Sequence, residues 1–142
     1  MQIHRHALVR YTPEQMFDLV NDVEAYPRRF PWCLGAHVTE HDDQHLVARL
    51  DLRFAGVTQH FSTRNVLDRP HTIRMQFVHG PFDWLHGAWS FTLLGTAGCK
   101  VALDLDFEVN NKLTGFAFGL GFKKLADRMV DDFCAEARRA YG

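Results

Sequence analysis

Apolar and polar side chains alternate along most of the sequence after Leu34. The clearest example is the segment 99–109, in which six apolar residues occupy every second position. Successive side chains of a β-strand point to opposite faces, so a period of two is typical of strands. Each of these segments is apolar on one face only. The sheet that they form must therefore be covered on one side.

Seven strands are predicted in all, six of them antiparallel neighbours joined by tight turns and one at the N-terminus. The alternation places them at 2–10, 35–40, 45–54, 57–67, 72–79, 84–94 and 99–109. Within the first strand, Ile3 and Leu8 lie on opposite parities, which predicts a register change. In 84–94, Leu93 shares the parity of Trp89 and is expected to point inward with it.

Two short helices are predicted between the first two strands. Thr12 is a favourable N-cap, Pro13 suits the first helical position, and Gln15 completes a capping box. Pro27 and Pro31 then prevent a long helix, so the aromatic stretch around them is expected to form a second short helix or a turn.

Only the C-terminal stretch, 110–142, is long enough to cover the sheet. It is predicted as one helix capped by Asn110 or Asn111, and about thirty helical residues span roughly 45 Å. Its second half repeats apolar residues at every fourth position, from Leu125 to Ala137. Its first half is apolar all round and glycine-rich, and each glycine costs about 1 kcal/mol relative to alanine.

This order of elements defines an α+β chain of the helix-grip type. A curved antiparallel sheet of about seven strands surrounds a long C-terminal helix, and two short helices follow the first strand. No linker or repeat interrupts the pattern, so residues 1–142 are expected to form a single domain.

The composition argues against several classes of function. Sixteen basic and seventeen acidic residues give a net charge of −1, so no overall field attracts DNA or an anionic membrane. Cys33, Cys99 and Cys134 lack metal or disulfide spacing and indicate a reducing compartment. No apolar run is long enough to span a membrane, and no leader is expected before the first strand. A cytoplasmic location is expected, with peripheral contact at the inner membrane as an alternative.

Three stretches carry a resemblance to a known family. They are MFDLVNDVEAYPRRFPWC (16–33), GPFDWLHGAWSF (80–91) and the ending FCAEARRAYG. Over its whole length, the chain resembles the START-like polyketide cyclase/dehydrase family, in the branch of coenzyme Q-binding proteins and ribosome-association toxins. It departs from the family at Arg28 and Arg29, where an acidic residue is usual.

This resemblance implies a fold that binds a hydrophobic ligand between the sheet and the long helix. It implies two alternative functions. The first, expected here, is ubiquinone binding in support of cellular respiration, with no enzymatic activity and no required cofactor. The alternative is that of a toxin of a toxin–antitoxin system, which binds the large ribosomal subunit and blocks subunit association. The expected partner is therefore a quinone, related isoprenoid or lipid, and otherwise the large subunit.

The many aromatic residues, which include twelve Phe and three Trp, fit either a lined cavity or a filled core. The glycine-rich start of the final helix and the resemblance favour a cavity. Phe116, Leu120 and Phe122 are expected to form a mobile gate at its mouth, with Phe30 and Trp32 opposite. The full predicted ligand-binding set is Phe17, Phe30, Trp32, Phe54, Phe61, Phe77, Trp89, Phe91, Phe107, Phe116, Leu120 and Phe122.

No catalytic or metal-binding residues are predicted. The histidines at 37, 41 and 45 recur every four residues, but they fall on a strand and a turn, where this spacing does not bring side chains together. The polar residues on apolar faces are Gln59, Thr63 and Asn65. They suit orienting hydrogen bonds to a carbonyl ligand and not proton transfer.

Basic residues in and before the final helix suggest an RNA-facing patch as an alternative. Acidic neighbours in the same helix dilute this charge, so a solvated helix face is the favoured interpretation. The basic residues concerned are Arg28, Arg29, Lys123, Lys124, Arg128, Arg138 and Arg139.

Overall fold

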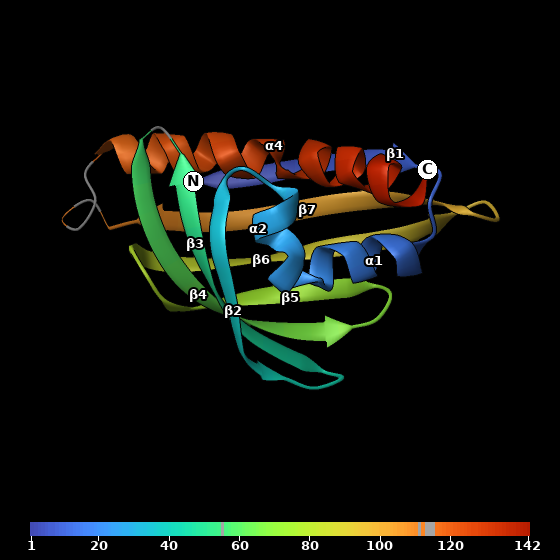
Figure 1. Ribbon diagram of the computed structural model, residues 1–142, viewed down its shortest axis with the longest axis horizontal. Helices are drawn as coiled ribbons and strands as arrows, with labels where there is room; N and C mark the ends of the chain where they lie inside the picture. Colours follow the sequence, from blue (N-terminus) through green and yellow to red (C-terminus); the bar gives the residue numbers. More distant parts are fainter. Residues whose placement is uncertain (55, 111, 113–115) are drawn as a thin grey trace.

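A seven-stranded antiparallel sheet curves around one long C-terminal helix in the computed structural model (Figure 1). The structure describes residues 1–54, 56–110, 112 and 116–142. The strand order is β1-β7-β6-β5-β4-β3-β2, so consecutive strands are neighbours from β2 to β7 and only β1 pairs across the sequence. The predicted helix-grip fold is confirmed.

The strands agree with the alternation to within two residues at most ends. They are β1 (Gln2–Val9), β2 (Cys33–His41), β3 (His45–Phe54), β4 (Val57–Asp68), β5 (Thr72–His79), β6 (Phe82–Leu94) and β7 (Gly98–Val109). The helices are α1 (Pro13–Asn21), the 3₁₀ turn η1 (Val23–Ala25), α2 (Tyr26–Arg29) and α4 (Phe116–Tyr141).

Two predictions about side-chain direction were wrong. β1 pairs with β7 without a shift, from Gln2 opposite Asp106 to Val9 opposite Cys99, and Leu8 therefore points outward, 70% exposed. Leu93 is also exposed, at 57%. It lies near the tip of the β6–β7 hairpin, which extends past the end of α4 in Figure 1, so no helix covers it.

The start of α1 forms as predicted, because its signals are local. The Thr12 hydroxyl accepts a hydrogen bond from the Gln15 backbone N–H at 3.1 Å, and the Gln15 side chain accepts from the Thr12 N–H at 2.9 Å. These two bonds satisfy N–H groups that have no partner within the helix. α1 then buries Met16, Phe17 and Val20 against the sheet.

α4 covers the concave face of the sheet and packs against β1, β3, β7 and α1. Its inward residues, among them Phe122, Val130 and Phe133, are almost fully buried. Asn110 accepts a hydrogen bond from the Lys112 N–H at 3.1 Å. The predicted start of the helix around Asn111, with residues 113–115, lies outside the described residues. Within the described part of the chain, no helix is long and apolar enough to cross a membrane.

The backbones of β6 and β7 leave no room for a side chain at Gly87. A Cβ atom there would lie 2.3 Å from the Asp104 carbonyl oxygen and 2.9 Å from the Leu105 Cα. We expect Gly87→Ala to lower the free energy of unfolding by about 1–3 kcal/mol, because the clashing atoms are backbone and cannot turn aside. Chemical denaturation with far-UV circular dichroism measures this.

Gly119→Ala is the matched control. The nearest atom to an added Cβ there is the flexible Met1 Cε, at 3.3 Å, and alanine is the better helix former by about 1 kcal/mol. We expect no loss of stability at this position. Equal unfolding midpoints for the Gly87 variant and the wild type would contradict the tight approach.

Candidate functional site

The aromatic side chains between sheet and helix form two groups. The first, the Phe133 cluster, consists of Tyr26, Phe30, Trp32, Trp89 and Phe133. The ring of Phe133 lies 4.7 Å from Phe30, 5.4 Å from Tyr26 and 5.2 Å from Trp89, all edge to face. Such pairs contribute about 0.5–1.5 kcal/mol each beyond area burial. The cluster fixes α2 and the second half of α4 on the sheet.

The second group, the Phe122 cluster, consists of Phe61, Phe82, Phe107, Phe118 and Phe122. The Phe122 ring lies 4.9 Å from Phe107 and 5.0 Å from Phe82, again edge to face. Phe82, its central member on the sheet, is absent from the predicted set. It is the first residue of β6 and directly follows Gly80-Pro81, whereas the strand predicted from alternation begins at residue 84.

A cavity of about 70 Å³ remains between the two clusters. Its wall is almost entirely apolar. Ligand sites usually measure about 300–1,000 Å³, and an apolar cavity of about 150 Å³ can bind benzene. The interior is thus a packed core with a small residual cavity. It is intermediate between the lined cavity and the filled core that the sequence left open. The lining residues are Val20, Val23, Tyr26, Ala48, Leu50, Phe61, Thr63, Asn65, Ile73, Met75, Leu85, Trp89, Leu103, Leu105, Phe122, Met129 and Phe133.

Two polar side chains on β4 face this cavity. The Thr63 hydroxyl donates a hydrogen bond to the Asn65 side-chain oxygen at 3.0 Å, and Asn65 is 92% buried, with 8% of its surface exposed. Among the described residues, no acceptor bonds to the Asn65 side-chain N–H groups. The sequence had singled out both residues for a carbonyl contact. Gln59, the third candidate, does not line the cavity.

The cavity lining offers few groups for acid–base chemistry. Tyr26 is the titratable residue of the lining, its hydroxyl donates to the Val20 carbonyl, and burial raises its pKa above the ordinary range. The three cysteines are free and buried, and burial raises the pKa of Cys33 and of Cys99 to about 11. These groups stay protonated at neutral pH, and a thiol is a poor nucleophile in that state. In the described part of the chain, no group of three His, Cys, Asp or Glu could hold a metal ion.

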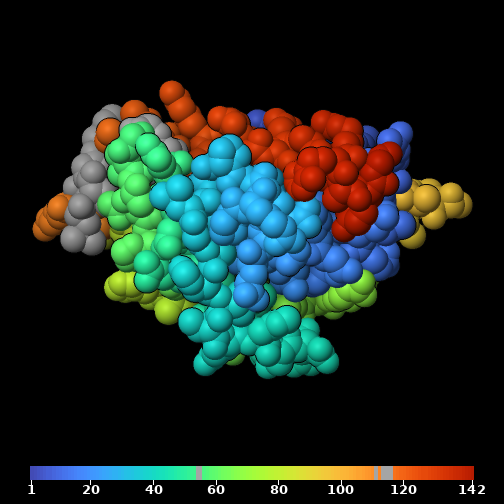
Figure 2. All heavy atoms as spheres, viewed as in Figure 1, coloured from blue at the N-terminus to red at the C-terminus, as the bar shows by residue number. Residues whose placement is uncertain are grey.

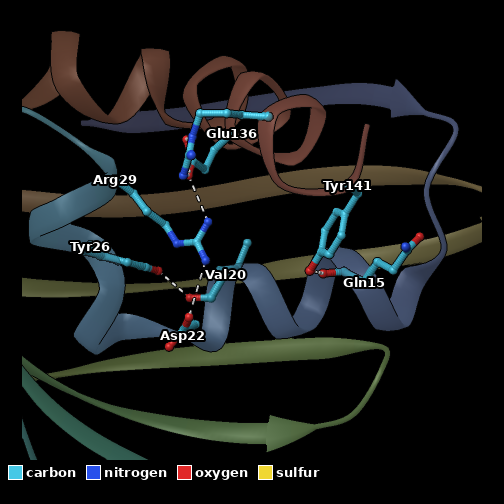
Figure 3. Close-up of polar contacts among 8 residues, drawn as sticks. Gln15, Val20, Asp22, Tyr26, Arg29, Glu136 and Tyr141 are labelled. Atoms are coloured by element: carbon cyan, nitrogen blue, oxygen red, sulfur yellow. Dashed lines mark hydrogen bonds and ion pairs between the residues drawn. The ribbon is translucent and has the colours of Figure 1, made fainter.

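An ion-pair network joins α2 to the end of α4 (Figure 3). Arg29 of α2 donates to Glu136 of α4 at 2.8 Å and lies 3.6 Å from Asp22, while the Arg139 Nε donates to Glu136 at 3.0 Å. The Tyr141 hydroxyl adds a bond to the Gln15 carbonyl at 3.1 Å. In the space-filling view, atoms of α1, α2 and α4 meet on this face of the molecule (Figure 2). Arg29, predicted as a surface cation, is therefore engaged between α2 and α4, whereas Arg139 stays exposed on α4 and pairs with Glu136 of the same helix.

The predicted ligand-binding residues are placed in several environments. Phe61, Trp89 and Phe122 line the cavity. Phe77 is half-buried beside Phe82. Leu120 is 46% exposed and does not line the cavity. The remaining described members are buried in the surrounding packing, namely Phe17, Phe30, Trp32, Phe91 and Phe107. The side chains of Phe54 and Phe116 lie outside the described residues.

The predicted gate stays a prediction. Phe122 is 2% exposed within its cluster, and Phe30 and Trp32 pack in the other cluster around Phe133. The lining residues that sequence reasoning missed include Tyr26, Met129 and Phe133. A sequence signal was present for Met129 and Phe133. Both belong to the apolar residues that recur at every fourth position from Leu125 to Ala137, which were interpreted as an ordinary core stripe.

The curved sheet, the long helix and the apolar space between them define the class: a START-like, helix-grip protein. A START superfamily protein from Mycobacterium smegmatis is similar in structure, with a TM-score of 0.81 and 19% identity, over 98% of each chain. The Zhui aromatase/cyclase from Streptomyces sp. R1128 has a TM-score of 0.84 and 20% identity, over 98% of this chain and 94% of that one. At these identities the likeness establishes the fold alone.

Sequence comparison places the chain in one family. Residues 9–134 match the family model described as polyketide cyclase/dehydrase and lipid transport, and the chain belongs to this family. The ribosome association toxin RatA of Vibrio cholerae is 45% identical over 99% of this chain and 98% of its own length. The mitochondrial coenzyme Q-binding protein coq10 of Schizosaccharomyces pombe is 27% identical over 92% of this chain and 83% of its own length. The predicted family is confirmed.

The Arg29–Glu136–Arg139 network makes stability depend on pH. Arg139 and then Arg29, by hydrogen bonding, hold the pKa of Glu136 below its usual range, against the opposing effect of burial. A carboxyl whose pKa is lowered by folding stabilises the protein above its unfolded pKa of about 4.3, and this contribution is lost as pH falls through the lower, folded pKa.

We therefore expect Glu136→Gln to lower the unfolding free energy by about 2 kcal/mol at pH 7. The difference from wild type should shrink as pH falls below about 4. Denaturant unfolding across pH measures this, with exposed Glu40→Gln, which has no ion pair among the described residues, as the control. A difference that is independent of pH would refute the proposed role of the network.

Proposed function

We propose that this chain is a ribosome-association factor, which binds the large ribosomal subunit and blocks its association with the small one. The observation that carries the proposal is the 45% identity to a protein named ribosome association toxin, over nearly the whole of both chains. Identity to the coenzyme Q-binding relative is 27%. This difference reverses the order of the two functions expected from the sequence.

The tightly packed interior favours a function that is carried out by the outer surface of the protein. The cavity of about 70 Å³ is smaller than a quinone site requires, and its lining offers no general acid or base with a pKa near neutrality. We infer that the chain acts by binding and not by catalysis. The two aromatic clusters then serve to hold a rigid shape that presents the outer side of α4.

Sedimentation with purified ribosomal subunits tests this function. We expect the wild-type chain to co-sediment with large subunits at low salt, not with small subunits, and to decrease the fraction of joined ribosomes when both subunits are present. Absence from the large-subunit fraction at low salt would overturn the proposal.

A second function, binding of a hydrophobic carbonyl ligand such as ubiquinone or a related isoprenoid, is favoured by one observation. Asn65 directs an amide into an apolar cavity and is bonded there only through its oxygen, among the described residues. A free amide N–H in such a site suits a carbonyl acceptor. Met75 and Met129, which are flexible, form part of the wall and would allow it to widen.

Thermal unfolding with a short-tailed ubiquinone tests the second function. A ligand at one hundred times its Kd stabilises the folded state by about 2.7 kcal/mol, which raises the Tm by several degrees in a chain of this size. We expect this shift to vanish in Asn65→Leu and to persist in Gln59→Leu, which changes the same strand away from the cavity. No shift in the wild type, together with no quinone or lipid in an organic extract, would exclude it.

A further inference from the structure

We propose that a groove beside α4 binds the phosphate backbone of ribosomal RNA. The groove, of about 350 Å³, is called here the α4 groove and is formed by Trp32, Arg53, Gly121, Lys124, Leu125 and Arg128 with Pro31. It lies where the turn before β2, the end of β3 and the middle of α4 come together along the upper edge of Figure 1. This inference rests on the proposed ribosome association and assigns it a surface.

Three cations line this groove from two elements. Lys124 and Arg128 are four residues apart on α4, so their side chains emerge next to each other. Arg53 reaches the groove from β3, and its backbone N–H donates to the Trp32 carbonyl at 2.9 Å, which joins two of the walls. All three are exposed. Among the described residues, Arg53 and Lys124 have no carboxylate within ion-pair distance, and the carboxylate near Arg128 is Asp132, at 4.0 Å.

Three of the four acidic residues of α4 have partners away from the groove. Asp127 and Asp131 each lie 3.2 Å from the guanidinium of Arg5, on the β1 side of the helix. Glu136 is bound by Arg29 and Arg139. The remaining carboxylate, Asp132, accepts a hydrogen bond from the Trp32 indole at 3.0 Å. Three of the four acids that appeared to dilute the basic residues in the sequence are thus partnered by groups outside the groove, and the fourth, Asp132, lies 4.0 Å from Arg128.

This arrangement favours a nucleic-acid backbone as the occupant. Arginine presents a planar fork that matches phosphate, and lysine adds a mobile point charge. The overall charge is −1, so electrostatic attraction of a polyanion is confined to the surface where the cations gather. The polyanion then binds in one orientation and not over the whole surface. The groove is concave, so it can enclose a single backbone, whereas a flat bilayer surface would touch its rims. Buried Trp32 and Leu125 form its floor.

The α4 groove is tested by charge-reversal variants whose binding to large ribosomal subunits is measured at several salt concentrations. The variant is Lys124→Glu/Arg128→Glu. The control, Arg74→Glu/Lys100→Glu, makes the same change of net charge at exposed positions on the outer face of the sheet. Each is titrated with purified large ribosomal subunits at several salt concentrations. We expect the groove variant to bind at least about tenfold more weakly, with a salt slope reduced by about two, since each lost phosphate contact removes about one. The control should bind within about twofold of wild type.

The outcomes separate the two proposals. If wild type binds and the groove variant matches it in affinity and salt slope, the groove is wrong and ribosome association stands. If wild type does not bind, both fail. If the groove variant loses binding to anionic phospholipid vesicles but not to subunits, the groove binds lipid, and the RNA assignment is overturned. Thermal unfolding checks that each variant is folded, and Lys124→Gln/Arg128→Gln repeats the test with less change of charge.

Discussion

Everything in this structure depends on covering one apolar face of one sheet. Seven strands turn their apolar side chains to the same concave surface, and in the described part of the chain one helix is long enough to lie along it. Because burial of apolar surface contributes roughly 25 cal/mol per Å², α4 cannot leave the sheet without exposing both aromatic clusters. α4 is therefore required for the fold, and the sides of this helix that do not face the sheet are available for function.

Those other sides are chemically distinct. Toward β1, α4 carries carboxylates that are neutralised by Arg5, and toward α2 it carries Glu136, which is neutralised by two arginines. Toward β3 it presents Lys124 and Arg128 without close partners among the described residues, apart from Asp132 at 4.0 Å. One amphipathic helix thus separates an apolar core, two stabilising ion-pair networks and a cationic groove around its circumference. The small cavity is compatible with this division, since a rigid interior holds the outer surface in place.

Sequence could predict what depends on neighbouring residues. The capping box at Thr12 and Gln15, the alternation of the strands and the stripe on α4 are all local patterns, and the fold follows from them. The charge distribution could not be predicted, because it depends on pairs far apart in the chain: Arg5 with Asp131, and Arg29 with Glu136. Counting charges along the helix placed acids and bases together, whereas the fold separates them. The size of the cavity could not be predicted for the same reason, since it depends on how rings from α2, β4, β6 and α4 pack.

We propose above all that the chain works through the β3 side of α4, with its apolar interior packed. The most direct measurement is a cryo-electron microscopy reconstruction of the chain bound to the large ribosomal subunit. The account predicts density in which α4 remains on the sheet while Lys124 and Arg128 contact phosphates of ribosomal RNA. A complex in which the outer face of the sheet contacts the RNA, or in which α4 has moved away from the sheet, would contradict it.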